Sequence, residues 1–129
     1  MRRDPHSGPV SERARDADRD ARARGRVAMF NATRPDGLDG WTMDAGQYAL
    51  MRDHILDTID DAAGPDGTVA LRDVVDAAQD RYGAHPAFPG GRVRNYCTFV
   101  KVDLEARGEV ERLPRVSPQR IRRVTAARA

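Results

Sequence analysis

The sequence predicts an α+β domain, mainly α, in which three helices precede a short C-terminal β-hairpin. Apolar residues recur at helical spacing in three separate stretches between residues 44 and 107, and each stretch is followed by glycine. Residues 109–124 then contain two short apolar–polar segments around prolines, a pattern typical of a small hairpin or an edge. With 129 residues, the chain has room for one domain of ordinary size.

The first predicted helix begins after Asp44. Asp44 and Gln47 have the spacing of a capping box, in which the aspartate accepts backbone N–H groups and the glutamine reaches back. An apolar stripe with spacings of three and four follows, formed by Tyr48, Met51, Ile55, Leu56 and Ile59. The Gly-Pro-Asp-Gly stretch at residues 64–67 ends this helix.

Two more helices follow. Thr68 and Val69 leave room for a minimal strand, after which the second helix has an apolar stripe of Leu71, Val74, Val75, Ala78 and Tyr82. We expect Gly83 to end it in the position of a left-handed cap. The third helix runs from about Gly91 to Arg107 before a second cap glycine, Gly108. Its expected core face consists of Val93, Cys97, Val100 and Leu104.

The remaining segments differ in character. Residues 109–114 and 119–124 are expected to form two short extended pieces, which Pro114 and Pro118 confine to a small hairpin or an edge. Residues 27–43 are expected to form an extended N-terminal segment, with a turn near Pro35 between two extended pieces. Residues 1–26 contain many charges and almost no large apolar side chains, so we expect a charged flexible tail, with Met1 or Met29 as the start. The domain then covers 27–124, and residues 125–129 are expected to be frayed.

Charge is sorted along the chain. Residues 1–26 have a net charge of +3, residues 27–91 of −7, and residues 92–129 of +6, with ten Lys/Arg against four acids in the last segment. A basic end of this kind favours a polyanionic partner, and the alternative is a solvated arginine-rich surface.

The composition argues against several classes of protein. No apolar run approaches the roughly 18 residues of a membrane span, and no signal-peptide pattern is present, so we expect a cytoplasmic protein without a membrane partner. His6, His54 and His85 show no metal spacing with one another or with Cys97. No nucleophile–base pair stands out. We therefore expect no enzyme activity, no cofactor, no metal and no small-molecule ligand.

The order of helix, minimal strand, helix, helix and hairpin is that of a winged helix. The stretch LEARGEVERL, residues 104–113, resembles the end of helix three and the wing in many winged-helix proteins, where Leu-Glu-x-x-Gly turns into the first wing strand. Over roughly residues 45–124 the chain resembles the winged helix-turn-helix superfamily. From Phe30 onward it also resembles a family of small bacterial proteins catalogued only as a domain of unknown function, which implies a fold and no activity.

The superfamily resemblance implies DNA binding of the transcription-regulator kind, with a dimer as the expected form. On the third helix, the candidate contacts are Arg92, Asn95, Thr98 and Phe99. In the wing, they are Arg112, Arg115, Arg120, Arg122 and Arg123. Asparagine can bond an adenine edge twice, whereas wing arginines suit phosphates.

Phe99 and Val102 favour a different function. They lie on the helix face opposite the core, where an exposed apolar patch more often marks a protein contact. Two arrangements remain open: the N-terminal segment with Phe30 and Trp41 covers them, or two chains pair through them. The alternative function is a protein-interaction or dimerisation module of the same fold that does not bind DNA.

Overall fold

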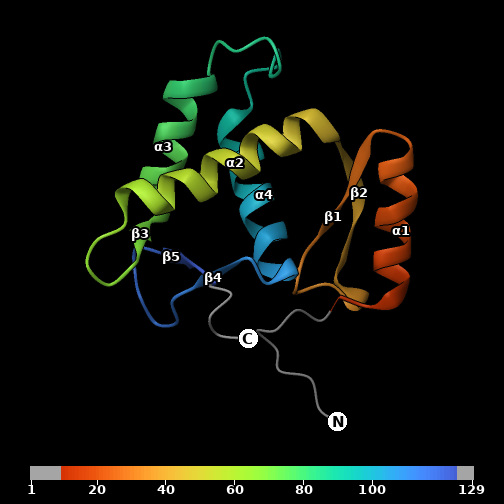
Figure 1. Cartoon of the computed structure of the whole chain (residues 1–129), viewed down its shortest axis with the longest axis horizontal. Coiled ribbons are helices and arrows are strands. Elements are labelled where there is room, and N and C mark those ends of the chain that lie inside the picture. Colours follow the sequence, from red (N-terminus) through yellow and green to blue (C-terminus); the bar gives the residue numbers. More distant parts are fainter. Residues whose placement is uncertain (1–9, 125–129) are drawn as a thin grey trace.

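The computed structural model describes residues 10–124. The described chain contains, in order, α1 (Glu12–Ala23), β1 (Arg26–Phe30), η1 (Pro35–Gly37), β2 (Leu38–Asp44), α2 (Ala45–Ala62), β3 (Val69–Ala70), α3 (Leu71–Tyr82), α4 (Val93–Arg107), β4 (Val110–Arg112) and β5 (Arg120–Arg123). Helices α2, α3 and α4 lie together beside the sheet of β3, β4 and β5, and α1 with the β1–β2 hairpin forms the other side (Figure 1). The expected α+β class is confirmed.

Helix α2 begins as the capping pattern predicts, with one difference. The Asp44 carboxylate accepts the backbone N–H of Gln47 at 3.0 Å. The Gln47 side chain does not complete a reciprocal capping box, because its Nε2 donates to the Ala87 carbonyl at 2.7 Å. Gln47 therefore ties the start of α2 to the connection between α3 and α4. The buried side chains of the helix include its predicted stripe of Tyr48, Met51, Ile55, Leu56 and Ile59.

The two cap glycines behave differently. Gly108 is left-handed, with φ 83°, and donates to the Glu105 carbonyl, as expected. The left-handed cap predicted at Gly83 is wrong, because this residue is right-handed with φ −57°. A side chain there would lie 2.6 Å from the Gln79 carbonyl oxygen. Gly83 therefore provides space at the helix end rather than an unusual backbone conformation.

The C-terminal hairpin joins a three-stranded antiparallel sheet in the order β3-β5-β4. Val110 pairs with Arg123 in the hairpin, and Ile121 pairs with Val69 of the minimal strand. Val110, Ile121 and Val69 are all buried and belong to the main core with the apolar faces of α2, α3 and α4. The hairpin is thus fixed to the domain along β5, whereas β4 is an outer strand.

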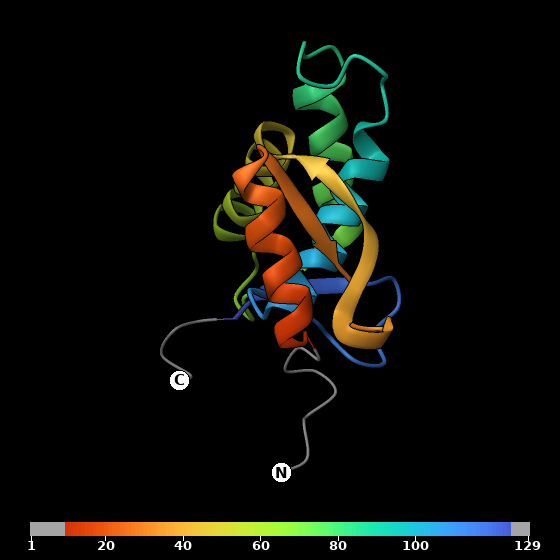
Figure 2. The ribbon, with the colours of Figure 1, turned by 90° about the vertical axis from the view of Figure 1, so that its right-hand side faces the viewer.

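The expected flexible tail is wrong for the stretch that α1 occupies. Ser11 caps this helix by accepting the Ala14 N–H at 3.0 Å, and Ala14, Asp18 and Ala21 are buried. Figure 2 shows α1 lying along the β1–β2 hairpin. Alanines four and three residues from Asp18 let the helix approach β1 closely, although no large apolar stripe marks it. The parts of the tail at 1–9 and of the frayed end at 125–129 lie outside the described residues.

Candidate nucleic-acid interface

Helix α4 carries the predicted reading residues, and its two halves differ in burial. The core face expected from the spacing is fully buried and consists of Val93, Cys97, Val100 and Leu104. The C-terminal half is buried on further sides through Lys101, Asp103 and Ala106. In contrast, the N-terminal half, with its capping residue, exposes Arg92, Asn95, Thr98 and Phe99. The accessible part of α4 is therefore roughly its first two turns.

Trp41 of β2 covers part of the apolar patch on α4. Its ring meets that of Phe99 edge to face, with centroids 5.3 Å apart. The Trp41 indole N–H donates to Asp39 at 2.9 Å, which fixes the orientation of this ring. Phe99 nevertheless remains 43% exposed, and Val102 is half-buried. The N-terminal extended segment thus supports one side of Phe99 without closing over it.

Three of the five predicted wing arginines already have partners within the chain. Arg120 donates to the Thr68 hydroxyl at 2.9 Å and to the Thr68 carbonyl at 3.2 Å. Arg122 pairs with Glu111 at 3.1 Å, and Arg123 pairs with Asp60 of α2 at 2.7 Å. Arg120 therefore has a structural role at the base of the wing, and binding of phosphate by the other two would compete with exposed ion pairs.

The other two wing arginines are more accessible. Arg112 at the end of β4 and Arg115 in the hairpin turn are exposed, and neither forms an ion pair with a described residue. Arg115 has φ 60°, a left-handed conformation that is uncommon for residues other than glycine. The end of β4 and the turn after it thus present two accessible arginine side chains.

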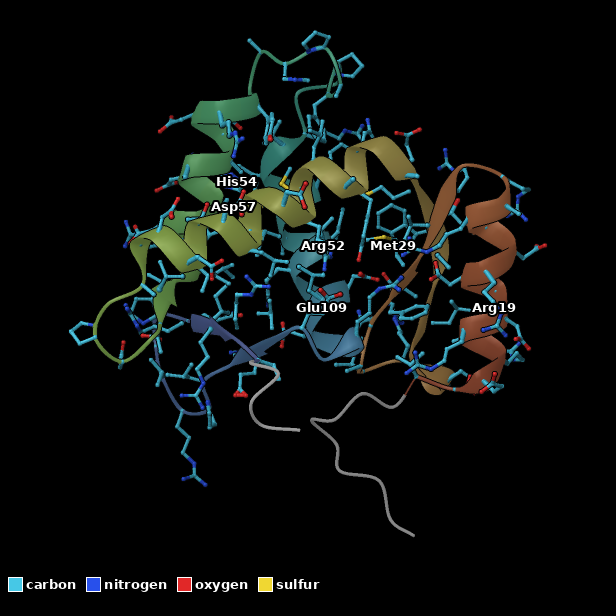
Figure 3. The ribbon with its side chains drawn as sticks, viewed as in Figure 1. Arg19, Met29, Arg52, His54, Asp57 and Glu109 are labelled. Atoms are coloured by element: carbon cyan, nitrogen blue, oxygen red, sulfur yellow. The ribbon has the colours of Figure 1, made fainter. Side chains whose placement is uncertain are left out.

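Polar contacts anchor the base of the wing to α4 and α2. Lys101, the single lysine of the chain, is 4% exposed, and its ammonium group donates to Glu105 at 2.5 Å and to Gln119 at 2.7 Å. Arg52 of α2 pairs with Glu109 just before β4 (Figure 3). These contacts hold the wing in a fixed position relative to α4.

A buried ionic network surrounds the C-terminal half of α4. Asp103 is fully buried and accepts hydrogen bonds from the Phe30 N–H at 2.8 Å, from Arg107 Nε at 2.8 Å and from the Tyr48 hydroxyl. Arg107 also donates to Asp18 of α1 at 3.1 Å. Sequence reasoning missed this network, although Asp103 and Arg107 have the spacing of a helical ion pair.

The network changes the acidity of its members. Burial raises the pKa of the Asp103 carboxyl, against the opposing attraction of Arg107. Burial and the neighbouring Asp103 charge raise the pKa of Tyr48, so its hydroxyl remains a donor. Burial alone would raise the pKa of Asp18, but hydrogen bonds from Arg107 and Arg22 outweigh it and lower that pKa. Arg107 is thus the shared cation of two buried carboxylates.

The same side chains occupy the outer edge of β1. Asp18 accepts the Ala28 N–H at 3.0 Å, and Asp103 accepts the Phe30 N–H. Arg107 donates to the Ala28 carbonyl at 2.9 Å and lies over the Phe30 ring at 4.0 Å. Side chains of α1 and α4 thereby satisfy backbone groups that a third strand would otherwise bind.

Residues 26–121 match a family described as "Family of unknown function (DUF6958)". The chain belongs to this family. No curated protein and no solved structure matches the chain. The DUF6958 segment begins at β1 and reaches Ile121 of β5, so it contains the predicted interface up to that residue and leaves α1 outside. Asp18, which pairs with Arg107, therefore comes from outside the matched segment.

Two reactive residue types of this DUF6958 protein are buried in structural positions. Burial raises the pKa of the Cys97 thiol to about 12, which makes it a poor nucleophile at neutral pH. The His54 ring lies in the core, with Nε2 3.1 Å from the Val74 carbonyl (Figure 3). Within residues 10–124, no group of three or more His, Cys, Asp or Glu side chains has the arrangement of a metal site. Among residues 10–124, each helix is too short or too polar for a membrane span.

His54 is expected to make the stability of this DUF6958 protein depend on pH. Burial lowers the pKa of His54, and the positive charge of Arg81 lowers it further, against the hydrogen bond to Val74 and the charge of Asp57. The unfolded chain therefore takes up a proton first. Stability is full above the ordinary pKa of about 6.5 and falls as the pH drops toward the lowered folded value, by at most about 1.4 kcal/mol per pH unit.

Urea unfolding at about pH 7.5 and about pH 5.5 measures this loss, and the variant His54→Leu provides the control. The variant is expected to lose less stability between the two pH values than the unaltered chain. An equal loss in both proteins would contradict a role for His54.

Proposed function

We propose that this protein is a winged-helix, nucleic-acid-binding protein that contacts duplex DNA with the first half of α4 and with the wing. The element order α2, β3, α3, α4, β4, β5 and the strand order β3-β5-β4 support the winged-helix assignment. In helix-turn-helix proteins the N-terminal residues of the recognition helix contact the base edges. The single observation that carries the proposal is that this half of α4 is accessible, whereas its C-terminal half is buried.

Accessible arginines flank the open half of α4 and provide charge for the phosphates. Arg92 caps the start of the helix, and Arg112 and Arg115 lie in the wing. Contacts between the wing base and the core, through Lys101 and Arg52, would hold both surfaces in one orientation for a duplex. Two copies on adjacent half-sites are the expected bound form, since helix-turn-helix proteins commonly bind as dimers.

The experiment that tests this function is a titration of the full chain into a short mixed-sequence duplex across a salt series. The double variant Arg112→Ala/Arg115→Ala is expected to bind more weakly at every salt concentration, with a salt slope reduced by about one for each lost phosphate contact. Removing two exposed arginines, Arg15 of α1 and Arg24 directly after this helix, gives a control with the same loss of charge.

The control variant is expected to retain the unaltered salt slope. Absence of binding by the unaltered chain even at about 50 mM salt would overturn the proposed function, because phosphate contacts are strongest there. If both double variants weaken DNA binding equally, the wing has no specific role. The duplex would then be attracted to the overall positive charge of the protein.

A second candidate function is protein interaction or dimerisation through the same face. The observation that favours it is the 43% exposure of Phe99, the single exposed large apolar side chain among the described residues. In a contact between proteins, the partner would cover Phe99, and this side chain would not contact DNA. Binding of the unaltered chain to duplex DNA at low salt, or its absence, therefore separates the two functions.

A further inference from the structure

We propose that a strip of side chains along one face of α4, formed by Asn95, Phe99 and Val102, selects A·T base pairs. The strip recognises thymine through the 5-methyl group of the base. The proposal rests on the proposed function, because it assumes that this half of α4 enters the major groove. Asn95, Phe99 and Val102 lie at positions i, i+4 and i+7, so they follow one another along one face of the helix; Asn95 and Phe99 are exposed, and the half-buried Val102 ends the strip. Seven residues span about 10 Å of helix, roughly three base-pair steps.

The side chains of this strip have the chemistry of A·T recognition. An asparagine amide can accept from adenine N6 and donate to N7, and Asn95 is exposed for such a contact. The thymine methyl is the apolar group of the major groove, and an exposed phenylalanine can cover it. Phe99, the residue that argues against a polar groove, thereby becomes a specificity residue.

Guanine has no comparable reader along the strip. Its usual partner is an arginine or lysine that binds O6 and N7 together. Arg94 is held by an ion pair with Asp76 of α3 at 2.6 Å, and Lys101 is buried in its contacts with Glu105 and Gln119. In this proposal Arg92, the exposed residue that caps the start of α4 one turn before Asn95, contacts the phosphate backbone and not a guanine edge.

Trp41 prepares Phe99 for this role. The edge-to-face contact at 5.3 Å supports the Phe99 ring on one side, and Asp39 holds the tryptophan in turn. An apolar surface that is already ordered loses little side-chain entropy when it covers a methyl group. The charges of Arg92, Arg112 and Arg115 complement a polyanionic duplex around the strip.

The test compares two duplexes that differ only in thymine methyl groups. The full chain is titrated into a short alternating A·T duplex and into the same duplex with deoxyuridine in place of thymidine. We expect binding to the thymine duplex to be about fourfold tighter for each methyl group covered. The variant Phe99→Ala is expected to bind both duplexes and to lose the difference between them.

A second variant separates the contribution of Asn95 from that of Phe99. Asn95→Ala is expected to weaken the preference for the A·T duplex over a G·C duplex of equal length and to retain the preference for thymine over uracil. Circular dichroism checks that both variants fold, which their exposed positions favour. Because each variant is compared on matched duplexes, any change in overall affinity cancels.

The outcomes are distinguishable. Equal binding of thymine and uracil duplexes by the unaltered chain overturns this inference and leaves DNA binding standing. A thymine preference that survives Phe99→Ala also overturns it. Tighter binding to the single strand than to either duplex would indicate base stacking on Phe99 and overturn methyl recognition. No binding to any DNA at low salt overturns the proposed function itself.

Discussion

Replacement of Asp103 by alanine is expected to lower the free energy of unfolding by about 3–5 kcal/mol, the usual cost of breaking a buried ion pair. The substitution removes the acceptor of the Phe30 N–H, of Arg107 Nε and of the Tyr48 hydroxyl. Each of these donors would then be buried with one fewer partner, at a cost of about 1–3 kcal/mol for a buried donor left unsatisfied. Urea unfolding followed by circular dichroism measures the change.

Two comparisons sharpen this prediction. Arg13→Ala breaks an ion pair with Asp36 of 2.6 Å between two exposed side chains, and we expect a loss below about 1 kcal/mol. Asp103→Asn retains one acceptor oxygen and nearly the same side-chain volume. Its loss in free energy of unfolding is expected to lie between those of Arg13→Ala and Asp103→Ala. A loss for Asp103→Ala no larger than that for Arg13→Ala would show that the network does not stabilise the fold.

Asp18→Ala is expected to cost about 2–3 kcal/mol, because it leaves the Ala28 N–H buried without its acceptor and removes one of two carboxylates from Arg107. The control is Asp20→Ala on the same helix, whose exposed pair with Arg24 spans one turn and contributes less than about 1 kcal/mol. Both variants change the same residue type to alanine within α1, so helix propensity affects them equally.

The loss in Asp18→Ala is also expected to depend on pH. Since the folded pKa of Asp18 lies below its ordinary value, the carboxylate stabilises the fold above about pH 4, and this contribution disappears as the pH falls through the folded pKa. Unfolding curves at neutral and acidic pH test this. Equal stability of Asp18→Ala and Asp20→Ala at neutral pH would mean that α1 does not depend on this contact.

Much of the domain follows from the spacing of large apolar residues. Two helices are defined by apolar faces that must be buried, from Tyr48 to Ile59 in α2 and from Val93 to Leu104 in α4. Gly108 marks where α4 ends. Helix α1 gives no such signal, because its buried face consists of Ala14, Asp18 and Ala21. Small and charged residues produce a pattern of the kind that a disordered segment also has.

The candidate interface was predictable in position and less so in chemistry. The exposure of Asn95, Thr98 and Phe99 follows from their angle to the core face of α4. The pairing of Arg120 and Arg123 does not follow from the sequence, because their partners are distant along the chain. Arg120 reaches Thr68 across 52 residues, and Arg123 reaches Asp60 across 63.

The side-chain contacts along the outer edge of β1 have a consequence for the behaviour of the protein at high concentration. An unoccupied strand edge can recruit a strand from a second molecule and begin amyloid-like aggregation. Asp18, Asp103 and Arg107 bind the Ala28 and Phe30 backbone groups that such a strand would need. Three charged side chains on two helices thus block this edge of β1 against a strand from a second molecule. Variants that lose them are expected to form fibrils before they lose their helices.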